Sequence, residues 1–291
     1  MITENSNGEF VVSIQGYAPY YINKEHELYN DALVDNLCLS LAGNILCLKG
    51  LNGNYCLNPT PTKYQLINDI GVLQAYVDTL PNLEVGEKYY VQLLARQKYN
   101  NDRNILSSLK LQDSFVKKEV IVDMVKSWEL PYGSYTTKKG DIIDNDSLVV
   151  YISPNPNPKS TSKAYIKLLE NSSSILVSNK NLLREANTCY FNSISRKIYK
   201  IVDIDLEHQE YLDEIVAYCK SILNESCLRV VRTRSGIHLL IKLSKTPKNQ
   251  WHKEIMQINS LFNVKEINEI APYGMTPLVG TIQGGVVPIF I

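Results

Sequence analysis

Two aspartates that alternate with isoleucine inside an apolar segment constrain this fold more than any other feature. Asp203 and Asp205 lie in IYKIVDIDL, a run that is typical of a buried β-strand. Residues two apart on a strand point to the same face, and their Cα atoms lie roughly 6–7 Å apart. Neighbouring carboxylates in apolar surroundings are unfavourable unless a positive charge lies between them, and a divalent metal ion is the obvious one. The sequence therefore predicts a strand whose acidic pair binds a metal ion.

The segments around this strand predict an α/β fold. The apolar residues of 209–223 fall on one stripe of a helix, and Thr246 followed by Pro247 is a good helix start. Short apolar runs predict strands at 197–206, 228–233, 237–243 and 286–291. The order strand, helix, hairpin, helix, strand is that of half a ferredoxin-like or RNA-recognition-like α/β sandwich. We therefore expect an α/β (α+β) core of this kind in the C-terminal third of the chain.

The first half of the chain is less regular. Apolar runs broken by Gly and Asn predict a β-rich extension over residues 1–60, with strands near 10–14, 37–41 and 45–48. The main α/β module is expected over residues 61–291. Further patterns predict helices at 63–79, 113–128 and 160–169, strands at 88–95 and 148–152, and a rigid Pro-rich turn at 153–158.

Composition limits the class of protein. The formal net charge of the 291 residues is zero, so the general basic bias of many nucleic-acid-binding proteins is absent, although basic residues cluster locally. The N-terminus has no signal-peptide pattern, and no apolar run approaches the roughly 18 residues that span a bilayer. The six cysteines have no Cys-x-x-Cys spacing, which indicates reduced core residues. We expect a soluble, cytoplasmic protein with no membrane partner, of cellular, viral or mobile-element origin.

A glycine turn between the two hairpin strands supplies a second group of polar side chains. In TRSGIH, Gly236 permits a tight turn and close approach of a ligand to the backbone. Ser235 offers a hydroxyl, His238 a ring N–H and Arg234 a positive charge, and such groups bind phosphate oxygens. The alternative for this turn is a plain hairpin with an edge histidine. The alternative for the acidic pair is that Asp205 lies at the N-cap of a helix and Asp203 pairs with a basic residue.

Together, the acidic strand and the Ser-Gly-x-His turn resemble two motifs of the archaeo-eukaryotic primase superfamily, which includes the primase-polymerases. The resemblance covers roughly residues 196–291. It implies a primase-polymerase-like core in which Asp203 and Asp205 are catalytic and hold Mg²⁺ or Mn²⁺. It also implies that Ser235 and His238 contact the phosphates of an incoming nucleoside triphosphate.

The third motif of that family departs from its usual form in this chain. The family normally places a further carboxylate, usually Asp, on a strand ahead of a Gly-Thr turn, and Pro277–Gly285 is similar to that turn. No Asp follows Asp213, so Glu266 and Glu269 are the candidate replacements. We select Glu269 as the third catalytic and metal-binding carboxylate. The family's basic residue near this motif is also missing, because no Lys or Arg follows Lys265.

Three functions compete at this point. The first is a metal-dependent nucleotidyltransferase of DNA replication, a primase or polymerase that adds NTP or dNTP on a single-stranded DNA or RNA template. Arg196, Lys197 and Arg232 would then bind the nucleic acid. The second is a catalytically weakened or inactive relative that binds nucleic acid or a protein partner, such as a replication protein. The third is a nuclease or nicking initiator, which ranks last because the chain has no His-x-His pair.

Overall fold

The chain forms two compact units in the computed structural model. One unit comprises residues 1–64 and 129–136, and the other comprises residues 65–128 and 137–291. The structure describes residues 2–13, 19–25, 29, 38–42, 45–50, 53–57, 62–99, 107–158, 194–206, 209–246, 251–262, 264–271 and 274–291. The predicted helix at 160–169 lies outside these residues. The first unit adds the segment 129–136 to the region that we expected as an N-terminal extension.

The first unit contains two three-stranded antiparallel sheets. Their strands are β1 (Ile2–Glu4), β2 (Phe10–Val12), β3 (Tyr20–Ile22), β4 (Cys38–Ala42), β5 (Ile45–Gly50) and β6 (Gly53–Leu57). Phe10 lies opposite Ile22, and both are buried with Val12, since alternate residues of a strand share a face. The three strands predicted in this region are confirmed as β2, β4 and β5.

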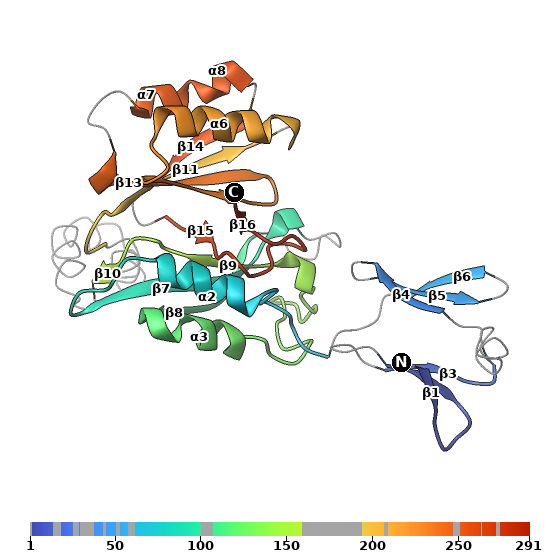
Figure 1. Ribbon diagram of the computed structural model, residues 1–291. Coiled ribbons are helices and arrows are strands. Elements are labelled where there is room, and N and C mark those ends of the chain that lie inside the picture. Colours follow the sequence, from blue (N-terminus) through green and yellow to red (C-terminus); the bar gives the residue numbers. More distant parts are fainter. Residues whose placement is uncertain are drawn as a thin grey trace. The chain divides into compact units, whose positions relative to one another are not determined.

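The second unit begins with a sheet in the order β10-β7-β9-β15, with β8 also paired to β7. These strands are β7 (Glu87–Ala95), β8 (Leu109–Val116), β9 (Leu148–Ile152), β10 (Asn157–Pro158) and β15 (Thr276–Pro277). Helices α2 (Ile70–Thr79) and α3 (Ile121–Ser127) lie beside this sheet (Figure 1). The predicted strands at 88–95 and 148–152 are confirmed, and the Pro-rich turn contributes only a two-residue edge strand, β10.

Two predicted helices in this region are shorter than expected. Helix α2 begins at Ile70 because the Asp69 side chain caps it, accepting a hydrogen bond from the Val72 N–H at 2.9 Å. The preceding residues are extended instead, with Ile67 bridged to Thr281. The prediction of helix from residue 113 was wrong, because 113–116 belong to β8 and pair with β7. Pairing with a neighbouring strand overrides the helical spacing of apolar residues there.

A second sheet follows in the order β14-β11-β13-β12-β16. Its elements are β11 (Tyr199–Asp205), α6 (Leu212–Ile222), β12 (Leu228–Arg232), β13 (Gly236–Lys242), α7 (Trp251–Met256), α8 (Ile258–Phe262), β14 (Glu266–Ile270) and β16 (Ile289–Phe290). The order of elements from β11 to β14 is that of ferredoxin-like sheets. The predicted mixed α/β class is therefore confirmed, and all strand pairs among the described residues are antiparallel.

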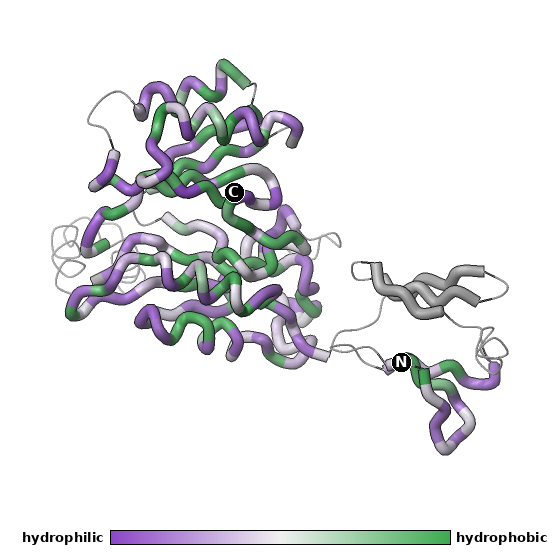
Figure 2. Tube along the Cα trace, viewed as in Figure 1, coloured by the Kyte–Doolittle hydropathy of each residue, from purple (hydrophilic) through white to green (hydrophobic). Residues whose placement is uncertain are grey.

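The two faces of this sheet differ in character. Figure 1 shows α6, α7 and α8 on one face of this sheet. The other face is turned toward the first sheet of the second unit, β10-β7-β9-β15. Val202 and Ile204 of β11 pack into the helix-side core with Ile215, Cys219 and Ile255. Figure 2 shows apolar residues running through these strands. The residues of β11 that alternate with this core therefore face the first sheet.

The end of the chain differs from the prediction. Within the expected strand 286–291, only Ile289–Phe290 forms a strand, β16, and it pairs with β12 at the edge of the sheet. The fourth strand of the ferredoxin-like order is β14, which the sequence did not predict as a strand. Its sequence EINEI is mostly polar and exposed, as expected for an edge strand protected by charges.

Asn155 joins the two sheets. Its Oδ1 accepts hydrogen bonds from the N–H groups of Ile198 (2.9 Å) and Tyr199 (2.8 Å). Its Nδ2 donates to the Tyr199 carbonyl oxygen at 3.0 Å, and the residue is 0% exposed. Asn155 follows β9, and Tyr199 begins β11. One buried side chain therefore fixes the start of the acidic strand against the first sheet.

Candidate active site

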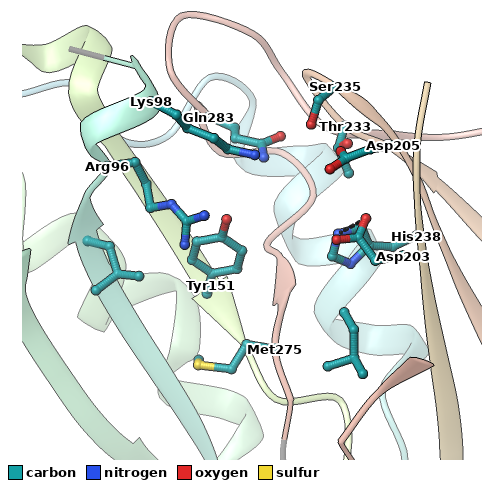
Figure 3. A pocket seen from close by; sticks show the side chains of 12 residues that line it. Arg96, Lys98, Tyr151, Asp203, Asp205, Thr233, Ser235, His238, Met275 and Gln283 are labelled. Carbon is teal, nitrogen blue, oxygen red and sulfur yellow. Dashed lines mark ion pairs between the residues drawn. The ribbon is translucent and has the colours of Figure 1, made fainter. Parts of the chain in front are cut away.

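A pocket of about 310 Å³ is lined by residues of both sheets of the second unit (Figure 3). This volume lies in the range of small-molecule sites. The lining residues are Leu94, Arg96, Lys98, Tyr151, Asp203, Asp205, Thr233, Ser235, His238, Ile270, Met275 and Gln283. Four of the predicted site residues therefore meet in one pocket, and they are Asp203, Asp205, Ser235 and His238.

The acidic pair faces the pocket as the alternation predicts. Asp203 and Asp205 are half-buried, and Asp203 lies directly opposite His238 on β13. The His238 Nε2 lies 3.1 Å from the Asp203 Oδ1. Burial alone would raise the pKa of Asp203, but the hydrogen bond and charge of His238, with the charges of Lys98 and Arg96, bring that pKa below its usual value. Asp203 is therefore ionised at neutral pH.

The glycine turn is held against the acidic strand by backbone hydrogen bonds. The Thr233 N–H donates to the Gly236 carbonyl at 2.8 Å, and the Leu206 N–H donates to the Ser235 carbonyl at 2.9 Å. A Cβ atom at Gly236 would collide with the carbonyl oxygen of Ile204. Glycine is thus required because the turn and β11 approach closely, and this approach places the Ser235 hydroxyl beside the carboxylates.

The opposite wall of the pocket is basic. Arg96 directly follows β7, and its backbone N–H donates to the Ser147 carbonyl at 2.8 Å. Its guanidinium carbon lies 5.8 Å from the centroid of the Tyr151 ring. Lys98 follows two residues later and also lines the pocket. The sequence shows these cations as a local basic cluster, but it gives no signal of the strand that they face.

Gln283 connects the basic wall to the glycine turn. Its Oε1 accepts from the Arg234 backbone N–H at 3.1 Å, and its Nε2 donates to the Tyr99 hydroxyl at 2.9 Å. The Arg234 guanidinium lies 4.8 Å from the Tyr99 ring centroid and donates to the Gly284 carbonyl oxygen. Arg234, predicted to bind nucleotide, is not among the described residues that line the pocket. Its side chain instead holds the loop that carries Gln283, a residue that sequence reasoning missed.

Glu269 is not brought to the acidic pair. It lies opposite Val202, so its side chain points to the helix-covered face of the sheet, away from Asp203. There it forms ion pairs with Lys200 at 2.9 Å and His252 at 3.0 Å. The prediction of Glu269 as the third carboxylate of the metal site was wrong, because its side chain lies on the opposite face of the sheet from Asp203. Glu266 lies opposite Asp205 and therefore on the pocket side.

The three residues predicted to bind nucleic acid lie elsewhere. The Arg196 guanidinium forms ion pairs with Glu87 at 2.6 Å and Glu84 at 3.1 Å, which gives it a structural role. Lys197 is exposed, and so is Arg232 on β12. None of the three is among the described residues that line the pocket. The structure therefore does not connect them to the acidic pair.

The donor set suits a hard divalent cation. Two carboxylates and the hydroxyls of Thr233 and Ser235 supply oxygen atoms to one pocket. Within the described part of the chain, no three His, Cys, Asp or Glu side chains are grouped at metal-binding positions. Mg²⁺ is commonly held by one or two carboxylates, with substrate phosphates and water completing its shell. The pair Asp203 and Asp205 fits that kind of site, in which the ligand brings the remaining oxygens.

No known protein family, curated protein or solved structure matches this chain significantly. Among the described residues, every helix is too short or too polar to cross a membrane.

Proposed function

We propose that this chain is a metal-dependent nucleotidyltransferase of the primase-polymerase type. It would add nucleotides from NTP or dNTP to a strand on a nucleic-acid template during DNA replication. The observation that carries the proposal is the composition of the pocket. Asp203 and Asp205 face a basic wall of Arg96 and Lys98, and Ser235 lies on the same side of the pocket as Asp205. This combination suits a polyphosphate ligand that arrives with a divalent cation.

Each side chain has a defined task in this proposal. Asp203 and Asp205 hold Mg²⁺ or Mn²⁺, which when bound neutralises charge on the reacting phosphate and lowers the pKa of the attacking hydroxyl. Lys98 and Arg96 bind non-transferred phosphate oxygens through charge-assisted hydrogen bonds. The Ser235 hydroxyl donates a hydrogen bond to the same phosphate oxygens. His238 orients the Asp203 carboxylate through its Nε2.

The fold adds support to the resemblance in the sequence. The acidic strand and the Ser-Gly-x-His hairpin are adjacent strands, β11 and β13, of a ferredoxin-like sheet. The Arg96–Lys98 wall also supplies positive charge to a site whose third sequence motif lacks it. The proposal rests on the geometry of the site rather than on the fold type, because one fold hosts many functions.

A second candidate function is a relative that binds nucleotide or nucleic acid without turnover. The position of Glu269 on the far face of the sheet favours it, because the carboxylate selected as the third metal ligand does not face the acidic pair. In that case the pocket would bind the metal and its phosphate ligand, while strand extension would be absent.

Thermal unfolding with Mn²⁺ and a nucleoside triphosphate tests the proposal on the full chain. Saturation at 100 times Kd should stabilise the wild type by about 2.7 kcal/mol. Asp203→Asn/Asp205→Asn should lose that gain, whereas the matched control Glu269→Gln should keep it. Primer extension with the same proteins then separates the two functions. Binding without extension supports the second candidate. The absence of any metal-dependent stabilisation of the wild type rejects the nucleotidyltransferase and leaves only a relative that binds nucleic acid or a protein partner.

A further inference from the structure

The pocket has a polar end and an apolar end. Figure 3 shows Lys98 and Ser235 at one end and Met275 at the other. Between them lie the Tyr151 ring and the acidic pair. The polar end is the part that the proposed function uses for metal and phosphate. The apolar end has no task in that chemistry.

Both walls change character along their strands. On the first sheet the pocket lining passes from Leu94 to Arg96 at the end of β7. On the second sheet, Ile270 of β14 lies opposite Ile201 of β11. Ile201 precedes Asp203, the first residue of the acidic pair, by two positions. The apolar residues therefore come from separate strands and line one pocket, so the change in polarity belongs to the site as a whole.

Met275 is brought to this end by a close approach of its own segment to β14. A Cβ atom at Gly274 would collide with the Ile270 side chain, so glycine allows the chain to pass against that strand. Met275 is half-buried and lines the same pocket as Ile270. An unbranched, polarisable thioether adapts its shape to a flat aromatic ring and makes favourable contacts with the ring edge.

We propose that the Met275 end holds the base of the nucleotide, and that it does so by packing rather than by hydrogen bonding. This inference rests on the proposed function, because it assumes a phosphate group at the polar end. A nucleoside triphosphate has the matching form, with an anionic chain at one end and a flat ring at the other. The side chains of Met275, Ile270 and Leu94 have no N–H or O–H group. They therefore cannot distinguish the four bases by their edges, and base choice is left to the template.

Isothermal titration of the full chain in Mn²⁺ tests this assignment, with each of four nucleoside triphosphates and with inorganic triphosphate as probes. In the absence of template, the wild type should bind the four nucleotides within about threefold of one another, and inorganic triphosphate more weakly. Met275→Ala should weaken nucleotide binding roughly three- to tenfold and leave inorganic triphosphate unchanged. Met275→Leu conserves volume and should retain most of the affinity. Met256→Ala, a half-buried methionine of α7, is the matched control and should change neither.

The outcomes separate this inference from the proposed function. Failure of the wild type to bind any triphosphate overturns both. Binding of inorganic triphosphate as tightly as nucleotides overturns only the base site. A preference above tenfold for one base also overturns it, as does a Met275→Ala effect that is equal for nucleotides and inorganic triphosphate, or no effect at all.

Discussion

Glu87 provides a quantitative test of the structure outside the pocket. Its carboxylate accepts hydrogen bonds from Arg196 Nε at 2.9 Å and Nη2 at 2.6 Å, and from the Ser195 hydroxyl. The Arg196 hydrogen bond is the largest influence and outweighs burial, and with Ser195 and the Glu84 backbone it lowers the pKa of Glu87 from 4.5 to about 2. The Glu87 side chain is only 5% exposed, so solvent screens this interaction weakly.

The lowered pKa of Glu87 stabilises the folded state. A fall in pKa from 4.5 to about 2 on folding corresponds to roughly 3 kcal/mol at neutral pH. Because the pKa is lower in the folded state, this stability is fully present above about pH 4.5 and is lost as the pH falls through about 2. Glu87→Gln should therefore lower the free energy of unfolding at pH 7 by about 3 kcal/mol.

The control and the assay come from the same ion-pair cluster. Glu84 contacts the same Arg196, but its side chain is 68% exposed, so Glu84→Gln should have an effect below about 1 kcal/mol. Urea unfolding followed by the fluorescence of Trp128 and Trp251 reports on the second unit. The difference between wild type and Glu87→Gln should shrink by about half at pH 3. Equal effects of the two substitutions at pH 7, or a difference that does not change with pH, would show that Arg196 does not lower the pKa of Glu87.

Three further predictions concern residues that position the pocket. Asn155→Ala removes the three hydrogen bonds of a buried side chain and should lower the free energy of unfolding by at least about 2 kcal/mol in urea. Gly236→Ala should abolish metal-dependent nucleotide stabilisation, because the new Cβ collides with β11, whereas Gly71→Ala in α2 should change stability by less than about 1 kcal/mol. Gln283→Leu should weaken binding of inorganic triphosphate with Mn²⁺, while Thr281→Val in the same loop should lower only the melting temperature.

The elements that the sequence predicts well are those whose pattern is decided locally. Strands β11, β12 and β13 and helix α6 all appear within a few residues of their expected bounds. Each is a run of apolar residues at one clear period, buried in a single core.

The elements that the sequence did not predict depend on pairing with strands that are distant in the sequence. Residues 113–116 have apolar neighbours at helical spacing, yet they pair with β7 as part of β8. Strand β14 is mostly polar because it lies at an edge, so its sequence has no clear two-residue alternation of apolar side chains. Local propensity is a weak guide in both cases, since pairing across the sheet decides the outcome.

The same distinction explains which half of the candidate site was visible in the sequence. The acidic half lies on neighbouring strands of one sheet, whereas Arg96 and Lys98 follow a strand of another sheet, β7, roughly a hundred residues earlier. Spacing within a strand predicts which residues share a face, but it says nothing about the register with a partner strand. Glu269 lies opposite Val202, and this register places its side chain on the helix side. A shift of one residue would have reversed that outcome, so the identity of any third carboxylate is decided by strand pairing and not by the motif.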